Sequence, residues 1–244
     1  MSLTRMFVAQ GLAPGSELRL GEEPARYLGR VLRLRSGDTI HVFNGADGEW
    51  SAEIRQLGKS DVSLVIHDSI ERQSESGLKV HLVQGISRGE RMDFVVQKAT
   101  ELGVKRITPV LTDYGVVKLN DNRTVKRRDH WRRVAESACE QSGRICPPLV
   151  DTPLPLNDWL GNARDRDGSD LILRPGAGKS LSTLPEPQTR LCLLIGPEGG
   201  FSDREYDDAD VAGFEPMTVG PRILRTETAA VAAIAIAQSR WGDV

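Results

Sequence analysis

The sequence of 244 residues has few cysteines and no long apolar run. Its three cysteines, Cys139, Cys146 and Cys192, are odd in number and form no C-x-x-C pair, which is typical of a reducing cytoplasm. The longest unbroken apolar run, Ala229 to Ala237, has nine residues, whereas a membrane span needs about 20. The N-terminal residues lack the pattern of an export signal. We therefore expect a soluble, cytoplasmic protein.

Several catalytic patterns are also missing. The four histidines are scattered, and none has a second His or Cys at ligand spacing, so we expect no bound metal. Gly176–Ser180 matches the end of a phosphate-binding loop, but Leu173 stands where the first glycine belongs. Pro185 and Pro187 follow where the helix of that motif would begin. No G-x-S-x-G turn occurs, so nucleotide hydrolysis and covalent hydrolysis are both disfavoured.

The composition indicates a folded chain, and charge is unevenly distributed along it. Hydrophobic residues make up 39% of the sequence and the net charge is −2, so the chain is suited to fold into one large or two modest domains. Residues 79–150 carry 14 basic against eight acidic residues, and residues 1–35 are also net positive. The segments 36–78 and 151–244 are net negative. This asymmetry favours an anionic partner such as nucleic acid.

The first 72 residues predict short strands around one helix, which together suggest a small β-barrel. Strands are expected at Ser16–Leu20, Asp38–Asn44, Glu49–Leu57 and Asp61–Asp68, with Asn44-Gly45 and Asp47-Gly48 as turn signals. In the helix expected over 22–34, Tyr27, Val31 and Leu34 recur at helical spacing and would face the core, flanked by Leu28 and Leu32. Arg26, Arg30 and Arg33 lie on another face, for which a solvated helix surface is the simplest interpretation.

After a polar stretch, residues 71–77, which predicts a linker, strands and helices alternate. Strand-like runs occur at Val80–Ile86, Ile107–Leu111, Leu171–Arg174, Leu191–Ile195 and Met217–Val219. Helices are expected at Arg91–Leu102, at Thr124–Ser142, from the capping box Ser202-x-x-Glu205 to near Gly213, and at Thr228–Arg240. This alternation is typical of a parallel α/β sheet. We therefore predict two domains, residues 1–73 and 74–244.

Two of the predicted helices have informative faces. The helix over 124–142 places Trp131, Val134, Ala138 and Gln141 on one side and its basic residues elsewhere. The last helix is apolar nearly all round and consists mostly of small residues. Such a helix must be buried against close backbone neighbours or against another subunit.

The strongest local signal is the segment Ile195–Phe201, with the sequence IGPEGGF. It follows an apolar strand and precedes a capped helix, so it lies at the carboxyl edge of the sheet, where open α/β folds bind ligands. Its three glycines allow a ligand to approach the backbone closely, although an ordinary strand-to-helix turn is the alternative. Val219–Thr228 forms a second glycine-containing loop, with Arg222, Arg225 and Glu227.

These two segments carry a family resemblance, together with QKATELGV at 97–104 and EQSGR at 140–144. The chain closely resembles the bacterial small-subunit (16S) ribosomal RNA uridine-N3 methyltransferases. They belong to the knotted, or SPOUT, superfamily of S-adenosylmethionine-dependent RNA methyltransferases. Arg5, Phe7 and Val31–Asp38 extend the resemblance over most of the chain. The sequence departs from the family at Tyr27, where relatives often carry His, and at Val219, where Leu is usual.

The resemblance implies an N-terminal PUA-like RNA-binding barrel and a C-terminal α/β domain with a deep trefoil knot. It further implies S-adenosyl-L-methionine as cofactor, a homodimer with the active site near the subunit interface, and small-subunit ribosomal RNA or the assembled particle as substrate. Two alternatives stay open. One is a related knotted methyltransferase that acts on transfer RNA, and the other is a non-catalytic RNA-binding or ribosome assembly protein.

The same resemblance assigns residues to the cofactor. They are Leu173, Gly196, Pro197, Glu198, Gly199, Val219, Gly220, Ile223 and Leu224. For catalysis, uracil N3 bears a proton at neutral pH, so methyl transfer needs a general base or a cationic environment. Arg222 and Arg225 are candidates to stabilise charge on the uracil oxygens, and Glu198 or Glu227 to take the proton. Glu227 has a simpler alternative as a favourable charge at a helix start.

The target uridine must be unpaired before its N3 can react, because N3 lies on the Watson–Crick edge of the base. The enzyme therefore has to grip the surrounding RNA. Basic side chains outside the two loops are the candidate phosphate contacts. They are Arg5, Arg30, Arg33, Arg88, Lys126, Arg127, Arg128 and Arg144.

Overall fold

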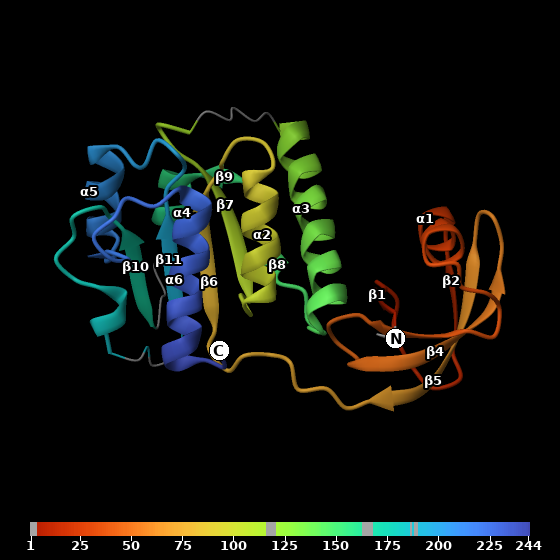
Figure 1. Cartoon of the computed structure of the whole chain (residues 1–244). Coiled ribbons are helices and arrows are strands. Elements are labelled where there is room, and N and C mark those ends of the chain that lie inside the picture. The colour runs from red at the N-terminus through yellow and green to blue at the C-terminus, as the bar shows by residue number, and fades with distance from the viewer. Residues whose placement is uncertain (1–3, 116–120, 163–167, 186, 188–189) are drawn as a thin grey trace. The chain divides into compact units, whose positions relative to one another are not determined.

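The computed structural model describes residues 4–115, 121–162, 168–185, 187 and 190–244 (Figure 1). By internal contacts the chain divides into two units. The N-terminal unit consists of Met1–Glu75 and Cys139–Cys146, and the C-terminal unit consists of Ser76–Ala138 and Pro147–Val244. This division lies two residues after the predicted boundary. No local pattern in the sequence predicted that residues 139–146 belong to the N-terminal unit.

The N-terminal unit is built on a five-stranded sheet with the order β1-β3-β4-β5-β2. Its strands are β1 (Arg5–Phe7), β2 (Glu17–Leu20), β3 (Thr39–Phe43), β4 (Glu49–Leu57) and β5 (Val62–Ile70). Four of these strands match the predicted runs, whereas the three-residue β1 is too short to leave a periodic signal. The turn between β3 and β4 forms as predicted, because Gly45 and Gly48 adopt positive φ and the Asn44 side chain accepts backbone hydrogen bonds.

The predicted helix over 22–34 is wrong in its second half. Helix α1 ends at Arg26 (Glu22–Arg26), and a π-helical turn, η1, follows over Tyr27–Val31. Its hydrogen bond from Leu32 N–H to the Tyr27 carbonyl spans five residues, so side chains rotate away from the 3.6-residue phase. As a result, Tyr27 and Val31 are 39% and 64% exposed, whereas Leu28 is fully buried.

The C-terminal unit has a parallel sheet with the order β12-β10-β11-β6-β7-β8, and β9 pairs with β7. The strands are β6 (Val80–Gly85), β7 (Arg106–Leu111), β8 (Leu149–Val150), β9 (Leu154–Pro155), β10 (Ser169–Leu173), β11 (Leu191–Ile195) and β12 (Glu215–Met217). Every described pair in this sheet is parallel, so the predicted parallel α/β architecture is confirmed.

Helices cover both faces of this sheet (Figure 1). On one face lie α2 (Arg91–Glu101), α3 (Asp121–Ser142) and α6 (Thr226–Trp241), and on the other lie α4 (Leu156–Gly161) and α5 (Asp203–Val211). Side chains alternate along β11: Leu191, Leu193 and Ile195 pack with the first group, and Cys192 and Leu194 with the second. None of the described helices combines the length and apolar character needed to cross a membrane.

The helix ends follow local chemistry. The predicted capping box forms at α5, where Ser202 Oγ accepts from Glu205 N–H and the Glu205 carboxylate accepts from Ser202 N–H. In α3 the buried face includes Trp131 and Ala138 as predicted, but Gln141 is exposed, whereas Cys139 is buried. Helix α6 begins at Thr226, two residues before its predicted start.

The predicted linker has no helix or strand over residues 71–77, but it is not free. Arg72 forms an ion pair with the buried carboxylate of Glu49. The Glu75 carboxylate is 2.7 Å from Nη2 of Arg144. These paired side chains belong to the N-terminal unit as far as Glu75, and the C-terminal unit begins at Ser76, within the predicted linker.

Candidate cofactor and active site

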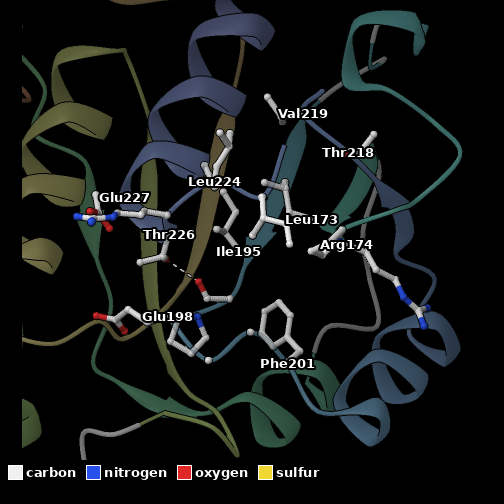
Figure 2. A pocket seen from close by; sticks show the side chains of 18 of the residues that line it. Leu173, Arg174, Ile195, Glu198, Phe201, Thr218, Val219, Leu224, Thr226 and Glu227 are labelled. Atoms are coloured by element: carbon white, nitrogen blue, oxygen red, sulfur yellow. Dashed lines mark hydrogen bonds between the residues drawn. The ribbon is translucent and has the colours of Figure 1, made fainter. Parts of the chain in front are cut away.

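A cavity of about 570 Å³ lies where β10, β11 and β12 end and their loops begin (Figure 2). This volume falls in the range of roughly 300–1,000 Å³ that is usual for small-molecule sites. The carboxyl ends of parallel strands share one edge of a sheet, which explains why three loops distant in sequence converge there. The lining includes Leu173, Gly196, Pro197, Glu198, Gly199, Val219, Ile223 and Leu224, all predicted for the cofactor. Gly220 is not among the residues that line the cavity.

The IGPEGGF loop depends on close backbone packing. A Cβ atom added to Gly85, at the end of β6, would lie 2.4 Å from Cδ of Pro197. Gly200 has φ +72°, a conformation that glycine adopts without strain, and its N–H donates to the Pro197 carbonyl at 2.9 Å. The loop is therefore folded tightly onto the end of β6 and presents its backbone to the cavity.

Two polar side chains join this loop to the start of α6, and sequence reasoning missed both. Thr226 Oγ1 donates to the Gly196 carbonyl at 2.6 Å, as drawn in Figure 2. The buried Gln84 donates through Nε2 to Thr226 Oγ1 at 2.9 Å. One signal in the sequence could have indicated these hydrogen bonds, namely a glutamine inside the apolar run Val80–Ile86. A buried side-chain amide needs hydrogen-bond partners.

Glu198 is engaged by the segment that precedes α2. Its Oε1 accepts from Arg91 Nη1 at 2.6 Å and from Arg88 N–H at 3.1 Å. Burial raises the pKa of Glu198, but hydrogen bonds from its own backbone, from Arg88 and from Arg91 outweigh burial and hold this pKa below the usual value. A carboxylate stabilised in its ionised form is a weak proton acceptor, so we revise its predicted role. Glu198 ties residues 88–91 to the loop.

The Glu227 carboxylate has a different environment from that of Glu198. It lies in the first turn of α6 and lines the cavity. Its Oε2 atom is buried and has no hydrogen-bond partner among the described residues. Such an atom is costly to leave unsatisfied, so it is suited to accept a hydrogen bond from a ligand.

Arg222 and Arg225 also line the cavity, and both are exposed. Within the described part of the chain, neither guanidinium forms an ion pair or a side-chain hydrogen bond. Their charges are therefore available to an anionic or electron-rich ligand. The structure brings all four predicted catalytic residues to the same cavity.

The cavity wall fits a flat, partly polar heterocycle. Apolar side chains line its centre, among them Leu173, Ile195, Met217 and Leu224. The backbone N–H groups of Val219, Ile223 and Leu224 donate no hydrogen bond within the described residues. Apolar faces with a few unpaired backbone donors are what an adenine ring requires. Among the described residues, no group of three or more His, Cys, Asp or Glu is placed to hold a metal ion.

The Gly176–Ser180 segment forms no phosphate-binding loop. Lys179 Nζ pairs with Glu215 Oε2 at 2.8 Å, and residues 181–183 form only a short 3₁₀ turn, η2 (Leu181–Thr183). A phosphate site of this kind needs a helix N-terminus directly after the loop, and none follows here.

The predicted RNA contacts divide into exposed and buried residues. Arg30, Arg33 and Arg88 are exposed, as is Lys126 on α3. The Arg127 guanidinium lies 6.0 Å from the centre of the Trp131 ring, and Arg128 Nη2 lies 2.7 Å from Asp129 Oδ1. These side chains are partly exposed and remain candidates for phosphate contacts.

Arg5 and Arg144 lie inside the N-terminal unit, which does not fit their predicted role as phosphate contacts. Arg5 Nε pairs with Glu49 Oε1 at 2.9 Å, and its Nη1 donates to the Cys139 carbonyl at 2.6 Å. Arg144 is only 3% exposed and pairs with Glu75. Because buried guanidiniums bound to carboxylates are unavailable to phosphates, we withdraw both residues from the predicted RNA surface.

Comparisons with known proteins agree with this geometry. Residues 74–238 match a family model described as an RNA methyltransferase domain, and residues 20–66 match one described as an RNA methyltransferase PUA domain. Ribosomal RNA small subunit methyltransferase E of Buchnera aphidicola subsp. Schizaphis graminum is 33% identical over 242 residues, covering 99% of this chain and 98% of the relative. The protein of the same name from Bacillus subtilis is 29% identical over 222 residues, covering 88% and 86%.

Two solved structures are similar over the whole chain. A methyltransferase from Legionella pneumophila, in complex with S-adenosylmethionine, has a TM-score of 0.94 and 38% identity and covers 100% of both chains. A ribosomal RNA small subunit methyltransferase E from Neisseria gonorrhoeae, bound to S-adenosyl methionine, has a TM-score of 0.91 and 36% identity and covers 99% of both chains.

Proposed function

The chain belongs to the RNA methyltransferase family of the ribosomal RNA small subunit methyltransferases E, and we propose that it methylates N3 of one uridine in 16S ribosomal RNA. S-adenosyl-L-methionine is the methyl donor. The observation that carries this proposal is the convergence of the loops after β10, β11 and β12 on one cavity, with Glu227, Arg222 and Arg225 at its wall.

The cavity residues have distinct roles toward the cofactor. Leu173, Ile195 and Leu224 provide apolar contact for adenine, and the unpaired backbone N–H groups of the 219–224 loop bind its polar edge. When bound, S-adenosylmethionine supplies a methyl group already activated by a positively charged sulfonium. The protein's main contribution is therefore to orient the donor and the base.

The catalytic side chains act on the uracil. Glu227 accepts the N3 proton through its unpartnered Oε2, so that the nitrogen lone pair becomes available. Arg222 and Arg225 stabilise the negative charge that develops on the two uracil oxygens. Thr226 lies between Arg225 and Glu227, and its hydrogen bond to Gly196 fixes these groups relative to the IGPEGGF loop.

Exposed cations outside the cavity hold the RNA while the target base is unpaired. The candidates are Arg30, Arg33, Arg88, Lys126, Arg127 and Arg128. Arg88 is tied to the IGPEGGF loop because its N–H donates to Glu198. Phosphate contacts of this kind are independent of sequence, so an assembled particle or the RNA fold around the target must provide the specificity.

The active form is a cytoplasmic homodimer. Helix α6 is apolar nearly all round, yet Val231, Ala232 and Ala235 are only partly buried within one chain. Ile223, at the cavity rim, is 85% exposed. A second subunit against this surface would remove apolar side chains from water next to the active site.

The decisive experiment uses isotopically labelled S-adenosylmethionine with unmodified small-subunit particles, naked ribosomal RNA and transfer RNA. Nuclease digestion and mass spectrometry then locate the label. Label at N3 of one small-subunit uridine supports the proposal, and label on transfer RNA replaces the substrate assignment. If there is no label and no thermal shift with S-adenosylhomocysteine, the protein is a non-catalytic RNA-binding or assembly factor.

A further inference from the structure

One arginine in the cavity wall, Arg174, lies against aromatic side chains. Arg174 follows β10, and its guanidinium carbon lies 4.5 Å from the centre of the Tyr206 ring on α5. Phe201 meets the same ring edge-on, with ring centres 5.6 Å apart. All three side chains line the cavity. The guanidinium therefore lies over the Tyr206 ring, which serves as its aromatic platform.

This guanidinium has no carboxylate partner. Within the described part of the chain, Arg174 forms no ion pair and no side-chain hydrogen bond. The nearby carboxylate of Glu205 is occupied, because it accepts from the N–H groups of Asp113 and Ser202. Burial raises the pKa of Tyr206 despite the opposing effect of Arg174, so the platform stays a neutral phenol. The structure thus holds a positioned, unneutralised positive charge in the cavity wall.

Arg174 lies apart from the two carboxylates of the cavity. In Figure 2, Arg174 lies on the opposite side from Glu198 and Glu227. The methionine moiety of the proposed cofactor carries an α-carboxylate and an α-ammonium group in addition to the cationic sulfonium, and the carboxylate is its anionic group. Guanidinium groups bind carboxylates through two parallel hydrogen bonds, which gives orientation as well as affinity.

We infer that Arg174, braced on Tyr206, binds the α-carboxylate of the cofactor's methionine moiety and so selects for an intact amino acid group. This inference rests on the proposed function, since it concerns the same cavity. Arg174 is a specificity-determining residue, and Tyr206 is the positioning residue that supports its guanidinium.

The test compares two ligands that differ only at that carboxylate. S-adenosylhomocysteine carries it, and S-adenosyl-3-thiopropylamine has hydrogen in its place. Isothermal titration calorimetry on the full chain measures both dissociation constants for the wild type and for Arg174→Gln. We expect the variant to bind S-adenosylhomocysteine roughly 10- to 100-fold more weakly and to bind the decarboxylated ligand within about twofold of the wild type.

Matched variants separate the effect of the Arg174 charge from the effect of its aromatic support by Tyr206. Arg204→Gln removes a positive charge from an exposed side chain that pairs with Asp208 outside the cavity, and it should change neither constant. Tyr206→Phe keeps the ring and should bind like the wild type, whereas Tyr206→Leu should weaken S-adenosylhomocysteine alone by several-fold. Circular dichroism confirms that each variant is folded.

The outcomes are distinct. Equal weakening of both ligands by Arg174→Gln would show a merely structural role and overturn the inference. Unchanged affinity for both ligands, with weaker binding of small-subunit RNA, would assign Arg174 to an RNA phosphate and also overturn it. If the wild type binds neither ligand, the proposed function itself fails, and this result is distinguishable from a failure of the Arg174 assignment alone.

Discussion

Three arginines of the N-terminal unit and three of the C-terminal unit are in opposite electrostatic situations. In the N-terminal unit, Arg5 and Arg72 both contact the fully buried carboxylate of Glu49, and Arg144 is paired with Glu75. Around the cavity of the C-terminal unit, Arg174, Arg222 and Arg225 form no ion pair within the described residues. Neutralised arginines maintain a fold, whereas unneutralised ones leave a positive potential for a ligand.

The difference also predicts how each region responds to mutation. Loss of one member of a buried pair leaves a charge without a partner in a poorly solvated site, which costs about 3–5 kcal/mol of folding free energy. An exposed guanidinium with no protein partner contributes little to folding, and its removal changes stability by about 0.5 kcal/mol or less. The two regions should therefore separate stability from activity.

The largest effect is expected at the proton acceptor of the cavity. Glu227→Gln removes the basic oxygen but keeps the shape, and it should lower the rate of methyl transfer by about 10²- to 10⁴-fold. Single-turnover kinetics with labelled cofactor measure this rate. Glu198→Gln is the matched variant, and its loss should be smaller because Glu198 acts through Arg88 and Arg91. Equal losses would remove the distinction between the two carboxylates.

The N-terminal side of the comparison is tested by Glu49→Gln. This change leaves Arg5 and Arg72 without their shared carboxylate, so the free energy of unfolding should fall by about 3–5 kcal/mol. Urea unfolding monitored by circular dichroism measures it. Glu53→Gln, at an exposed carboxylate near His67, is the control and should change little. An equal loss of unfolding free energy in Glu49→Gln and Glu53→Gln would contradict the structural role of the buried pairs.

The cavity arginines should show the reverse pattern. Arg225→Gln should lower kcat by about 10²- to 10³-fold, because it removes charge stabilisation from the transition state. Its urea midpoint should stay close to that of the wild type, since the side chain is exposed and unpaired. A large drop in stability with normal kcat would place Arg225 with the structural arginines.

A smaller effect is the acid dependence of the N-terminal unit. Burial raises the pKa of Glu49, but hydrogen bonds and charge from Arg5, with hydrogen bonds from His41 and Arg72, hold this pKa below its usual value. A carboxyl whose pKa is lowered on folding stabilises the fold above its unfolded pKa and loses this contribution as the pH falls through its folded pKa. The stability difference between wild type and Glu49→Gln should therefore be full at pH 6 and shrink below about pH 4.5.

The smallest effect is expected at the exposed cations on α3. Lys126→Gln should weaken binding of small-subunit RNA by a few-fold and reduce the salt dependence of the logarithm of affinity by about one unit. Filter binding at several salt concentrations measures both. Lys179→Gln, which removes an exposed lysine paired with Glu215, is the matched control. An unchanged salt slope for Lys126→Gln would exclude this lysine as a phosphate contact.

Much of the fold was predictable because its signals are local. The apolar runs of β6, β7 and β11, the Ser202–Glu205 capping box and the Asn44–Gly48 turn each depend on a few neighbouring residues. The short elements β1, β8 and β9 were missed because two or three residues carry no period. The π-helical turn at Tyr27–Val31 was missed because its phase shift is set by packing on the core. The deep trefoil knot stays a prediction of the family resemblance.

The sequence predicted the loops of the candidate site but not the hydrogen bonds that join them. Residue types and strand positions indicated the segments around Gly196 and Arg222, and the family resemblance supplied their chemistry. The hydrogen bonds from Gln84 to Thr226 and from Thr226 to Gly196 join residues more than 25 positions apart, so no local pattern contains them. The Arg174–Tyr206 stack likewise unites separate strand and helix segments.

The class of fold, the positions of the ligand loops and the family were all predictable from the residues, because hydrophobic period, turn chemistry and motif order are properties of neighbouring residues. Which charges are free depends on the folded arrangement. Arg5 and Arg144 look like Arg174 and Arg225 in the sequence, but the first two are buried against carboxylates and the last two are not. The free energy of a charge depends on its solvent and its partners, and both are set by the folded chain.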